Sequence, residues 1–227
     1  MSLGTEQLPG DIKFNADGLV VVIAQDAATG TIRMVAWADK TAIERTIETG
    51  QAHFFSRSRS RLWRKGEESG NVLQVHAVWL DCDGDALIYR VSPVGPTCHT
   101  GRPTCFFDRR FPQDTGSPEI MASGSILETL DMVVEARRTA QSDESYMASL
   151  LHHPERARTK IIEEAEELCQ ALESEDDERV ASELADLLFH ALVAAQIRGV
   201  SSSDALRTLL GRLGVSGHIE KKSRNRE

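Results

Sequence analysis

The spacing of apolar and polar residues divides the chain into a first half typical of strands and a second half typical of helices. Apolar and β-branched residues dominate segments 19–25 and 31–38, and the turn-forming residues between them predict a β-hairpin. Asp39 is suited to begin a short helix that Gly50 ends. Further strands are predicted at residues 53–56, 73–81 and 86–92.

Beyond residue 125 the apolar positions recur at helical spacing. Residues 111–125 lack this periodicity and are rich in proline, glycine and serine, which is typical of a linker. We therefore predict two domains, 1–115 and 116–227: an α+β domain with a mostly antiparallel sheet, followed by an all-α helical bundle. The helices of the bundle are expected at residues 126–140, 145–151, 157–172, 178–197 and 203–213.

Composition and charge narrow the functional classes. With 41% apolar and 27% charged residues, the 227-residue chain is expected to fold. Its apolar runs fall short of the roughly 18 residues of a membrane span, so no membrane partner is expected. Residues 116–227 carry 13 basic and 21 acidic side chains, which argues against nucleic acid as a partner. No signal peptide is visible, which favours a cytoplasmic protein with reduced thiols; a plastid protein that has lost its transit peptide would look the same.

Three of the four cysteines fall between residues 82 and 105. Reduced thiols that cluster in the sequence suggest a metal site, and three thiolates with one open position are an arrangement suited to a catalytic zinc. Cys82, Cys98 and Cys105 are therefore candidate zinc ligands. Unligated cysteines in a small core are the alternative, and His99, beside Cys98, is by itself more often an ordinary loop histidine.

Three aspartates alternate at the end of the strand predicted over 73–81. In an extended chain Asp81, Asp83 and Asp85 point to one face, where three carboxylates repel one another unless they share a cation such as Mg²⁺ or Ca²⁺. A polar turn without a metal is an equally good interpretation of this short segment taken alone.

A basic stretch precedes these aspartates. Residues 56–66 contain five arginine and lysine side chains, interleaved with serines and one tryptophan. Guanidinium groups and hydroxyls suit phosphate, and a short basic patch in a nearly neutral half favours a small phosphorylated ligand over a polymer. A solvated turn and an RNA contact are the alternatives. The candidate ligand contacts are Arg57, Ser58, Arg59, Arg61, Trp63, Lys65 and Ser69.

Together these segments resemble the phosphoribosyl-AMP cyclohydrolases of histidine biosynthesis. The resemblance covers residues 14–110 and implies zinc on the three cysteines, Mg²⁺ on the three aspartates, and a homodimer with zinc at the subunit interface. It also implies hydrolysis of the N1–C6 bond of an adenine ring by zinc-activated water, with proton transfer by His99. The matching segments are 56–63, 65–66, 69–70, 81–85, 95–96, 98–101 and 105–106.

The helical half holds two pairs of carboxylates. Glu164 and Glu167 are three residues apart and share a helix face, as do Glu183 and Asp186 on the next predicted helix. If the two helices pack antiparallel, the four carboxylates converge and bind Mg²⁺. Lys160 lies on the same side as Glu164. A solvated acidic face is the usual alternative, but Glu183 and Asp186 are embedded in an almost wholly apolar helix.

This second pattern resembles the all-α nucleoside triphosphate pyrophosphatases and, over residues 126–222, the phosphoribosyl-ATP pyrophosphatases. The resemblance implies a helical bundle of that type, with Lys160 as a substrate contact. It also implies that Glu163 or Glu166 helps to orient water. One departure is Ile162, where many members have glycine.

The order of the two domains resembles the bifunctional proteins of histidine biosynthesis. The helical domain would hydrolyse phosphoribosyl-ATP to phosphoribosyl-AMP and pyrophosphate, and the first domain would then open the adenine ring. Two other functions agree with parts of the chain: a non-enzymatic metal or nucleotide sensor, and a house-cleaning pyrophosphatase for aberrant nucleotides.

Overall fold

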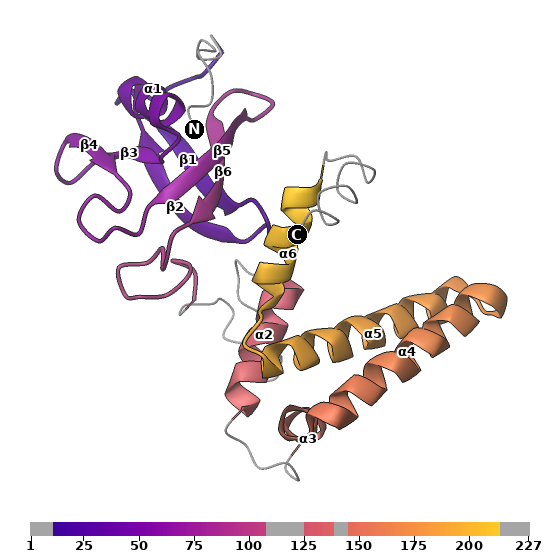
Figure 1. Ribbon diagram of the computed structural model, residues 1–227. Helices are drawn as coiled ribbons and strands as arrows, with labels where there is room; N and C mark the ends of the chain where they lie inside the picture. Colours follow the sequence, from indigo (N-terminus) through magenta and orange to yellow (C-terminus); the bar gives the residue numbers. More distant parts are fainter. Residues whose placement is uncertain (1–10, 108–124, 139–144, 214–227) are drawn as a thin grey trace, which may run out of the picture. The chain divides into compact units, whose positions relative to one another are not determined.

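The computed structural model describes residues 11–107, 125–138 and 145–213. Contacts divide the chain into two compact units, Met1–Ser125 and Ile126–Glu227, each of which is described by itself (Figure 1). The first is built on a sheet, and the described part of the second is helical, which confirms the expected two-part architecture. The segment expected to be a linker, 111–125, lies outside the described residues except for Ser125.

The described residues of the first unit, 11–107, form a six-stranded sheet with one helix. Its elements are β1 (Val20–Asp26), β2 (Ile32–Ala38), α1 (Lys40–Thr49), β3 (His53–Ser56), β4 (Arg61–Arg64), β5 (Leu73–Leu80) and β6 (Ala86–Pro93). The strand order is β4-β3-β2-β1-β6-β5. The pair β1–β6 is parallel and the other four pairs are antiparallel, so the sheet is mixed. The prediction of a mostly antiparallel sheet did not include this parallel pair.

Helix α1 begins and ends at the residues that the sequence predicts. The Asp39 carboxylate accepts a hydrogen bond from the Ala42 N–H and caps the first turn. Gly50 ends the helix in the left-handed conformation, with a φ of +66°. The buried Ile43 of this helix joins a core made by alternate residues of the strands, such as Val22.

Hydrogen bonds also join the segment before β3 to the start of β5. The Ala52 N–H donates to the Leu73 carbonyl at 3.0 Å, and the Val75 N–H donates to the Gly50 carbonyl at 2.8 Å. These bonds link strands that are far apart in the sheet order, so the sheet curls around its core.

A buried ion pair lies within the β1–β2 hairpin, beside a backbone contact with the loop after β6. The Arg33 guanidinium lies 2.9 Å from the Asp26 carboxylate, and the two side chains are 4% and 1% exposed. The other oxygen of Asp26 accepts hydrogen bonds from the backbone N–H groups of Ala28 and Thr29. The Arg33 carbonyl in turn accepts the Cys105 N–H at 2.9 Å. The ion pair therefore joins the two strands of the hairpin, and the Arg33 backbone holds one candidate metal ligand.

We expect Arg33→Met to lower the free energy of unfolding of this unit by about 3 kcal/mol, because it leaves the Asp26 carboxylate buried without its cation. All three tryptophans of the chain belong to residues 37–79, so urea unfolding followed by tryptophan fluorescence reports on this unit. The matched control is Arg45→Met, since Arg45 is half exposed and pairs with Glu48 on the surface. Its cost is expected to stay below about 1 kcal/mol. Equal costs for the two variants would contradict the role of the buried pair.

The second unit contains five helices within residues 126–138 and 145–213. They are α2 (Ile126–Arg137), α3 (Tyr146–His152), α4 (Pro154–Ser174), α5 (Asp177–Ile197) and α6 (Ser202–Arg212). Helices α4 and α5 form a long hairpin and lie side by side (Figure 1). Val134, Leu150 and Val193 form the centre of a core that joins α2, α3 and α5.

Helix α5 is, within the described ranges, the one helix that is long and apolar enough to cross a membrane, judged by length and composition alone. Only 22% of its most apolar window is buried in the chain. The core helix of a soluble protein passes the same test. The expectation that no segment reaches the length of a span rested on uninterrupted apolar runs, and polar residues such as Glu183, Asp186 and His190 interrupt those of this helix.

Candidate active sites

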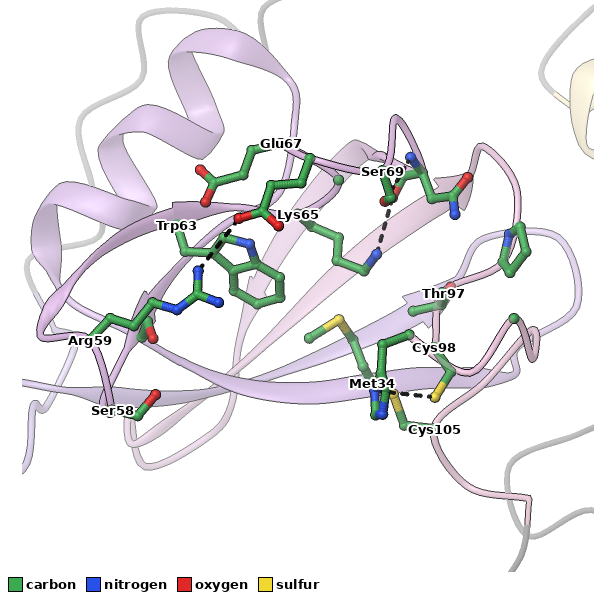
Figure 2. Close-up of a pocket in the computed structure, with 17 residues that line it drawn as sticks. Met34, Ser58, Arg59, Trp63, Lys65, Glu67, Ser69, Thr97, Cys98 and Cys105 are labelled. Atoms are coloured by element: carbon green, nitrogen blue, oxygen red, sulfur yellow. Dashed lines mark hydrogen bonds and ion pairs between the residues drawn. The ribbon is translucent and has the colours of Figure 1, made fainter.

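A pocket of about 570 Å³ opens in the first unit beside the loop that follows β6 (Figure 2). Its walls come from segment 56–71, from loop 96–105 and from Met34 of β2. The basic stretch and the cysteine loop, which are separate in the sequence, therefore meet at one cavity of the size that ligand sites have. The predicted site residues that line it are Ser58, Arg59, Trp63, Lys65, Ser69, Cys98, His99 and Cys105.

Cys98 and Cys105 lie close enough for each thiol to alter the pKa of the other. The Thr100 hydroxyl, 3.2 Å from the Cys98 sulfur, lowers the pKa of Cys98, whereas burial raises the pKa of Cys105 to about 11. Cys82 does not join them: the described residues contain no group of three thiols with sulfurs within 4.8 Å of one another. One chain therefore brings together two of the three candidate zinc ligands.

Lys65 points into the same pocket, and its ammonium group donates to the Asn71 carbonyl at 3.1 Å (Figure 2). Burial lowers the pKa of Lys65, and the Cys98 and Cys105 thiols oppose that change. A tight turn fixes this arrangement. Gly66 has a φ of +82°, and a Cβ at this position would lie 2.5 Å from the backbone carbon of Asn71, so glycine is required after the lysine.

Two of the predicted phosphate contacts, Arg57 and Arg61, do not line the pocket. The Arg57 guanidinium lies over the Trp37 ring, 5.2 Å from its centroid, and Arg61 pairs with Glu67 at 2.9 Å. Strand β4 begins at Arg61 and reverses the direction of the chain, so successive basic residues diverge. The pocket-lining Arg59 lies 3.7 Å from a carboxylate oxygen of Glu68.

The three aspartates gather at an exposed turn after β5. Each of Asp81, Asp83 and Asp85 has a carboxylate oxygen within 4.8 Å of the others. The cause is not the extended chain that we expected: Asp81 accepts hydrogen bonds from the N–H groups of Gly84, Asp85 and Ala86 and thereby closes the turn. These donors lower the pKa of Asp81, while the charges of Asp83 and Asp81 raise the pKa of Asp85. Three carboxylates that repel one another suit a hard cation.

A second carboxylate cluster joins α4 to α5. Glu164, Glu167 and Glu183 each have a carboxylate oxygen within 4.8 Å of the other two. Glu183 is 2% exposed, and its Oε2 is buried without a hydrogen-bond partner among the described residues, although Arg179 contacts its other oxygen. Burial and the charges of Glu167 and Asp186 raise the pKa of Glu183. A buried, unsatisfied carboxylate oxygen is costly, so this cluster fits a cation.

The other predicted residues of the helical unit surround this cluster. Lys160 lies 2.8 Å from the carboxylates of both Glu163 and Glu164, which raise its pKa and keep it charged. Asp186 is exposed and lies outside the group of three. Glu166 is also exposed.

Three residues near this cluster had no role assigned from the sequence, and neither had Met34 of the sheet-rich unit. His190 is buried, with Nδ1 3.6 Å from Glu164, and its Nε2 lies 2.9 Å from the Tyr146 hydroxyl. Arg156 lies near Tyr146, and its four-residue spacing from Lys160 was a signal that could have identified it. Met34 reaches the first pocket from β2, and no local sequence pattern marks it.

Comparisons with known proteins match a different family model to each unit. The family model for phosphoribosyl-AMP cyclohydrolase matches residues 34–107, and that for phosphoribosyl-ATP pyrophosphohydrolase matches residues 127–212. A histidine biosynthesis bifunctional protein HisIE of Deinococcus radiodurans is 41% identical over 91% of this chain and 94% of its own length. That of Wolinella succinogenes is 38% identical over 91% of this chain and 93% of its length. The chloroplastic hisIE protein of Arabidopsis thaliana is 40% identical over 95% of this chain and 79% of its length.

Proposed function

Since the chain belongs to the family of bifunctional histidine-biosynthesis proteins, which join a cyclohydrolase to a pyrophosphohydrolase, we propose how its residues divide the two reactions. The chain is a phosphoribosyl-ATP pyrophosphohydrolase in its helical part and a phosphoribosyl-AMP cyclohydrolase in its sheet-rich part. The two family matches on either side of residues 111–125 support domains 1–115 and 116–227. We place the protein in the cytoplasm; the plastid is the alternative, because the Arabidopsis relative is named chloroplastic.

In the helical unit, we assign Mg²⁺ to Glu164, Glu167, Glu183 and Asp186. The single observation that carries this assignment is the buried, unpartnered Oε2 of Glu183 at the meeting point of α4 and α5. Acidic pairs on two adjacent helices also support a bundle of the nucleoside triphosphate pyrophosphatase type. When bound, Mg²⁺ supplies positive charge to the phosphate oxygens.

Other residues of α4 bind the substrate and position water. Lys160 remains charged between two carboxylates and is placed to contact a phosphate group. Glu163 accepts a hydrogen bond from Lys160, and Glu166 lies one turn of the helix from Glu163, so either carboxylate is suited to orient the attacking water.

In the sheet-rich unit, we assign zinc to Cys98 and Cys105 of one subunit and Cys82 of the partner subunit. The separation of Cys82 from the other two thiols within one chain supports a shared site. When bound, zinc lowers the pKa of its water to about 7. His99 is adjacent to Cys98 in the same pocket and transfers protons, and the buried Lys65 places a cation beside the thiols.

The rest of this pocket holds the nucleotide. Arg59, Ser58 and Ser69 offer donors to phosphate, and Trp63 offers an aromatic wall. Arg57 and Arg61 lie outside the pocket of one chain, and we assign them to phosphate contacts at its rim. We assign a second Mg²⁺ to Asp81, Asp83 and Asp85, whose clustered carboxylates fit a hard cation.

A shared zinc site requires a homodimer, and the helical unit supports one as well. Ile162, Leu172, Leu184 and Leu188 of α4 and α5 are each 45% or more exposed, and a second copy of the chain would cover such apolar side chains. We expect light scattering to give twice the 25.0 kDa mass of one chain in buffer without detergent. A monomer that binds lipid vesicles would instead assign the apolar side of α5 to a membrane.

Supplying the purified protein with phosphoribosyl-ATP tests the proposed function. We expect Mg²⁺-dependent release of pyrophosphate, followed by appearance of the ring-opened product. Faster pyrophosphate release from other nucleoside triphosphates would favour a house-cleaning pyrophosphatase. Tight nucleotide binding without turnover would favour a sensor.

A further inference from the structure

Arg156, in the first turn of α4, is held in place by two neutral groups. Its guanidinium carbon lies 5.5 Å from the centroid of the Tyr146 ring. Its NH1 donates a hydrogen bond to the Ser149 hydroxyl at 2.7 Å. A guanidinium has five N–H donors, so this arrangement orients the side chain and leaves most of its donors available to a ligand.

The other cations of this part of α4 already have carboxylate partners. Arg158 pairs with Glu155 at 2.7 Å, and Lys160 lies between two carboxylates, one of which is Glu164. Within the described ranges, no carboxylate pairs with Arg156. An unpaired, preoriented guanidinium in a strongly acidic half of the chain has a geometry suited to phosphate.

Arg156 also lies on the same side of α4 as the carboxylate cluster. Arg156, Lys160 and Glu164 are spaced four residues apart and so follow one helix face. At 1.5 Å per residue, Arg156 is about 12 Å along the helix from Glu164, with Lys160 halfway. A chain of phosphates held at the carboxylates therefore has a row of cations along which to extend.

A hydrogen-bonded pair fixes Tyr146 relative to that cluster. His190 Nδ1 lies 2.9 Å from the Asp186 carbonyl, which can only accept, so Nδ1 carries the proton. In the neutral ring, Nε2 then accepts a hydrogen bond from the Tyr146 hydroxyl at 2.9 Å. The ring under Arg156 is thus anchored to α5, which also carries Glu183, and Arg156 keeps a defined position relative to the carboxylates.

We propose that Arg156 binds the two terminal phosphates of phosphoribosyl-ATP, which leave as pyrophosphate, and that Tyr146 positions it. This inference rests on the proposed carboxylate site as the place where the phosphate chain is held. A guanidinium that contacts the leaving phosphates stabilises the negative charge that develops on them when the bond to phosphorus breaks. Phosphoribosyl-AMP lacks these two phosphates, so its binding does not involve Arg156.

The test uses inorganic pyrophosphate and phosphoribosyl-AMP as product inhibitors of the intact protein. Hydrogen bonds to a charged group contribute about 1.5–3 kcal/mol, so Arg156→Gln should raise the inhibition constant of pyrophosphate by about 10- to 100-fold. The KM for phosphoribosyl-ATP should rise in parallel. The inhibition constant of phosphoribosyl-AMP should remain within about twofold of the wild-type value.

Two comparisons separate binding from folding. Arg158→Gln removes the same charge from an exposed position two residues away, and it should leave the inhibition constant of pyrophosphate unchanged. Tyr146→Leu, which removes the ring under Arg156, should weaken pyrophosphate binding more than Tyr146→Phe, which keeps it. Circular dichroism should show that all four proteins are folded.

Two results would overturn the proposal: pyrophosphate binding unchanged in Arg156→Gln, or phosphoribosyl-AMP binding weakened instead. Failure of the carboxylate assignment is a separate observation. It would appear as wild-type pyrophosphate release, and wild-type Mg²⁺ dependence, in a variant of Glu183.

Discussion

Glu183→Gln will abolish pyrophosphate release from phosphoribosyl-ATP while the ring opening of supplied phosphoribosyl-AMP continues nearly unchanged. The substitution keeps the size of a buried side chain and removes the charge that faces the other carboxylates of the cluster. Loss of a partner that merely supports a metal ligand costs 10- to 100-fold, so loss of a ligand should cost about 100-fold or more. Pyrophosphate release and ring opening are measured separately, each with its own substrate.

The matched control for this variant is Glu178→Gln, which removes the same charge from an exposed glutamate in the first turn of α5. Both activities should be retained in it. If Glu183→Gln stopped ring opening as completely as pyrophosphate release, in folded protein, the two reactions would share one site and the division of work proposed above would be wrong.

Cys98→Ala should have the reverse effect, because it removes a proposed zinc ligand from the sheet-rich unit. We expect metal analysis to show loss of zinc, ring opening to fall by about 100-fold or more, and pyrophosphate release to continue, so that phosphoribosyl-AMP accumulates. Cys105→Ala should behave alike. Cys169→Ser is the control: this exposed thiol belongs to α4 and should not affect zinc content. Full zinc occupancy in Cys98→Ala would refute the assignment.

Mixed dimers test whether two subunits share the zinc. Cys82→Ala and Cys98→Ala subunits should each lack zinc alone. If Cys82 comes from the partner subunit, a dimer that contains one of each has one complete site. An equal mixture that is unfolded and refolded together should then recover about a quarter of the zinc and of the ring-opening activity. No recovery would place all three ligands in one chain.

Local signals in the sequence predicted the fold where they were strong. Asp39 and Gly50 correctly predicted both ends of α1. The apolar periodicity predicted the bounds of the five described helices of the second unit to within a few residues. Strand β4 was missed, because Arg61–Arg64 shows neither alternation nor β-branched residues. Its pairing with β3 comes from tertiary structure, which local patterns do not contain.

The residues of the candidate sites were likewise predicted where local geometry decides their position, and not where the tertiary structure decides it. Spacing on a helix brought Glu164 and Glu167 to one face, since helix geometry is fixed by the backbone. By contrast, sequence proximity suggested that Cys82 lies with Cys98 and Cys105. Cys82 follows β5 at one edge of the sheet, whereas Cys105 is hydrogen-bonded to β2 on the other side of β1. The order of the strands in the sheet decides how far Cys82 lies from the other two thiols, and the local sequence does not specify that order.

The place of β1 in the sheet has a consequence for how the two halves can be separated. The span that matches the first family model, residues 34–107, begins after β1, yet β1 lies between β2 and β6 in the middle of the sheet. A fragment cut to that span would open two unpaired strand edges at its centre, the condition under which sheets join edge to edge and aggregate. The second family's span, residues 127–212, instead runs from α2 to the end of α6. The matched span therefore takes in nearly all of the described helices of the second unit, whereas in the first unit it leaves out a central strand of the sheet.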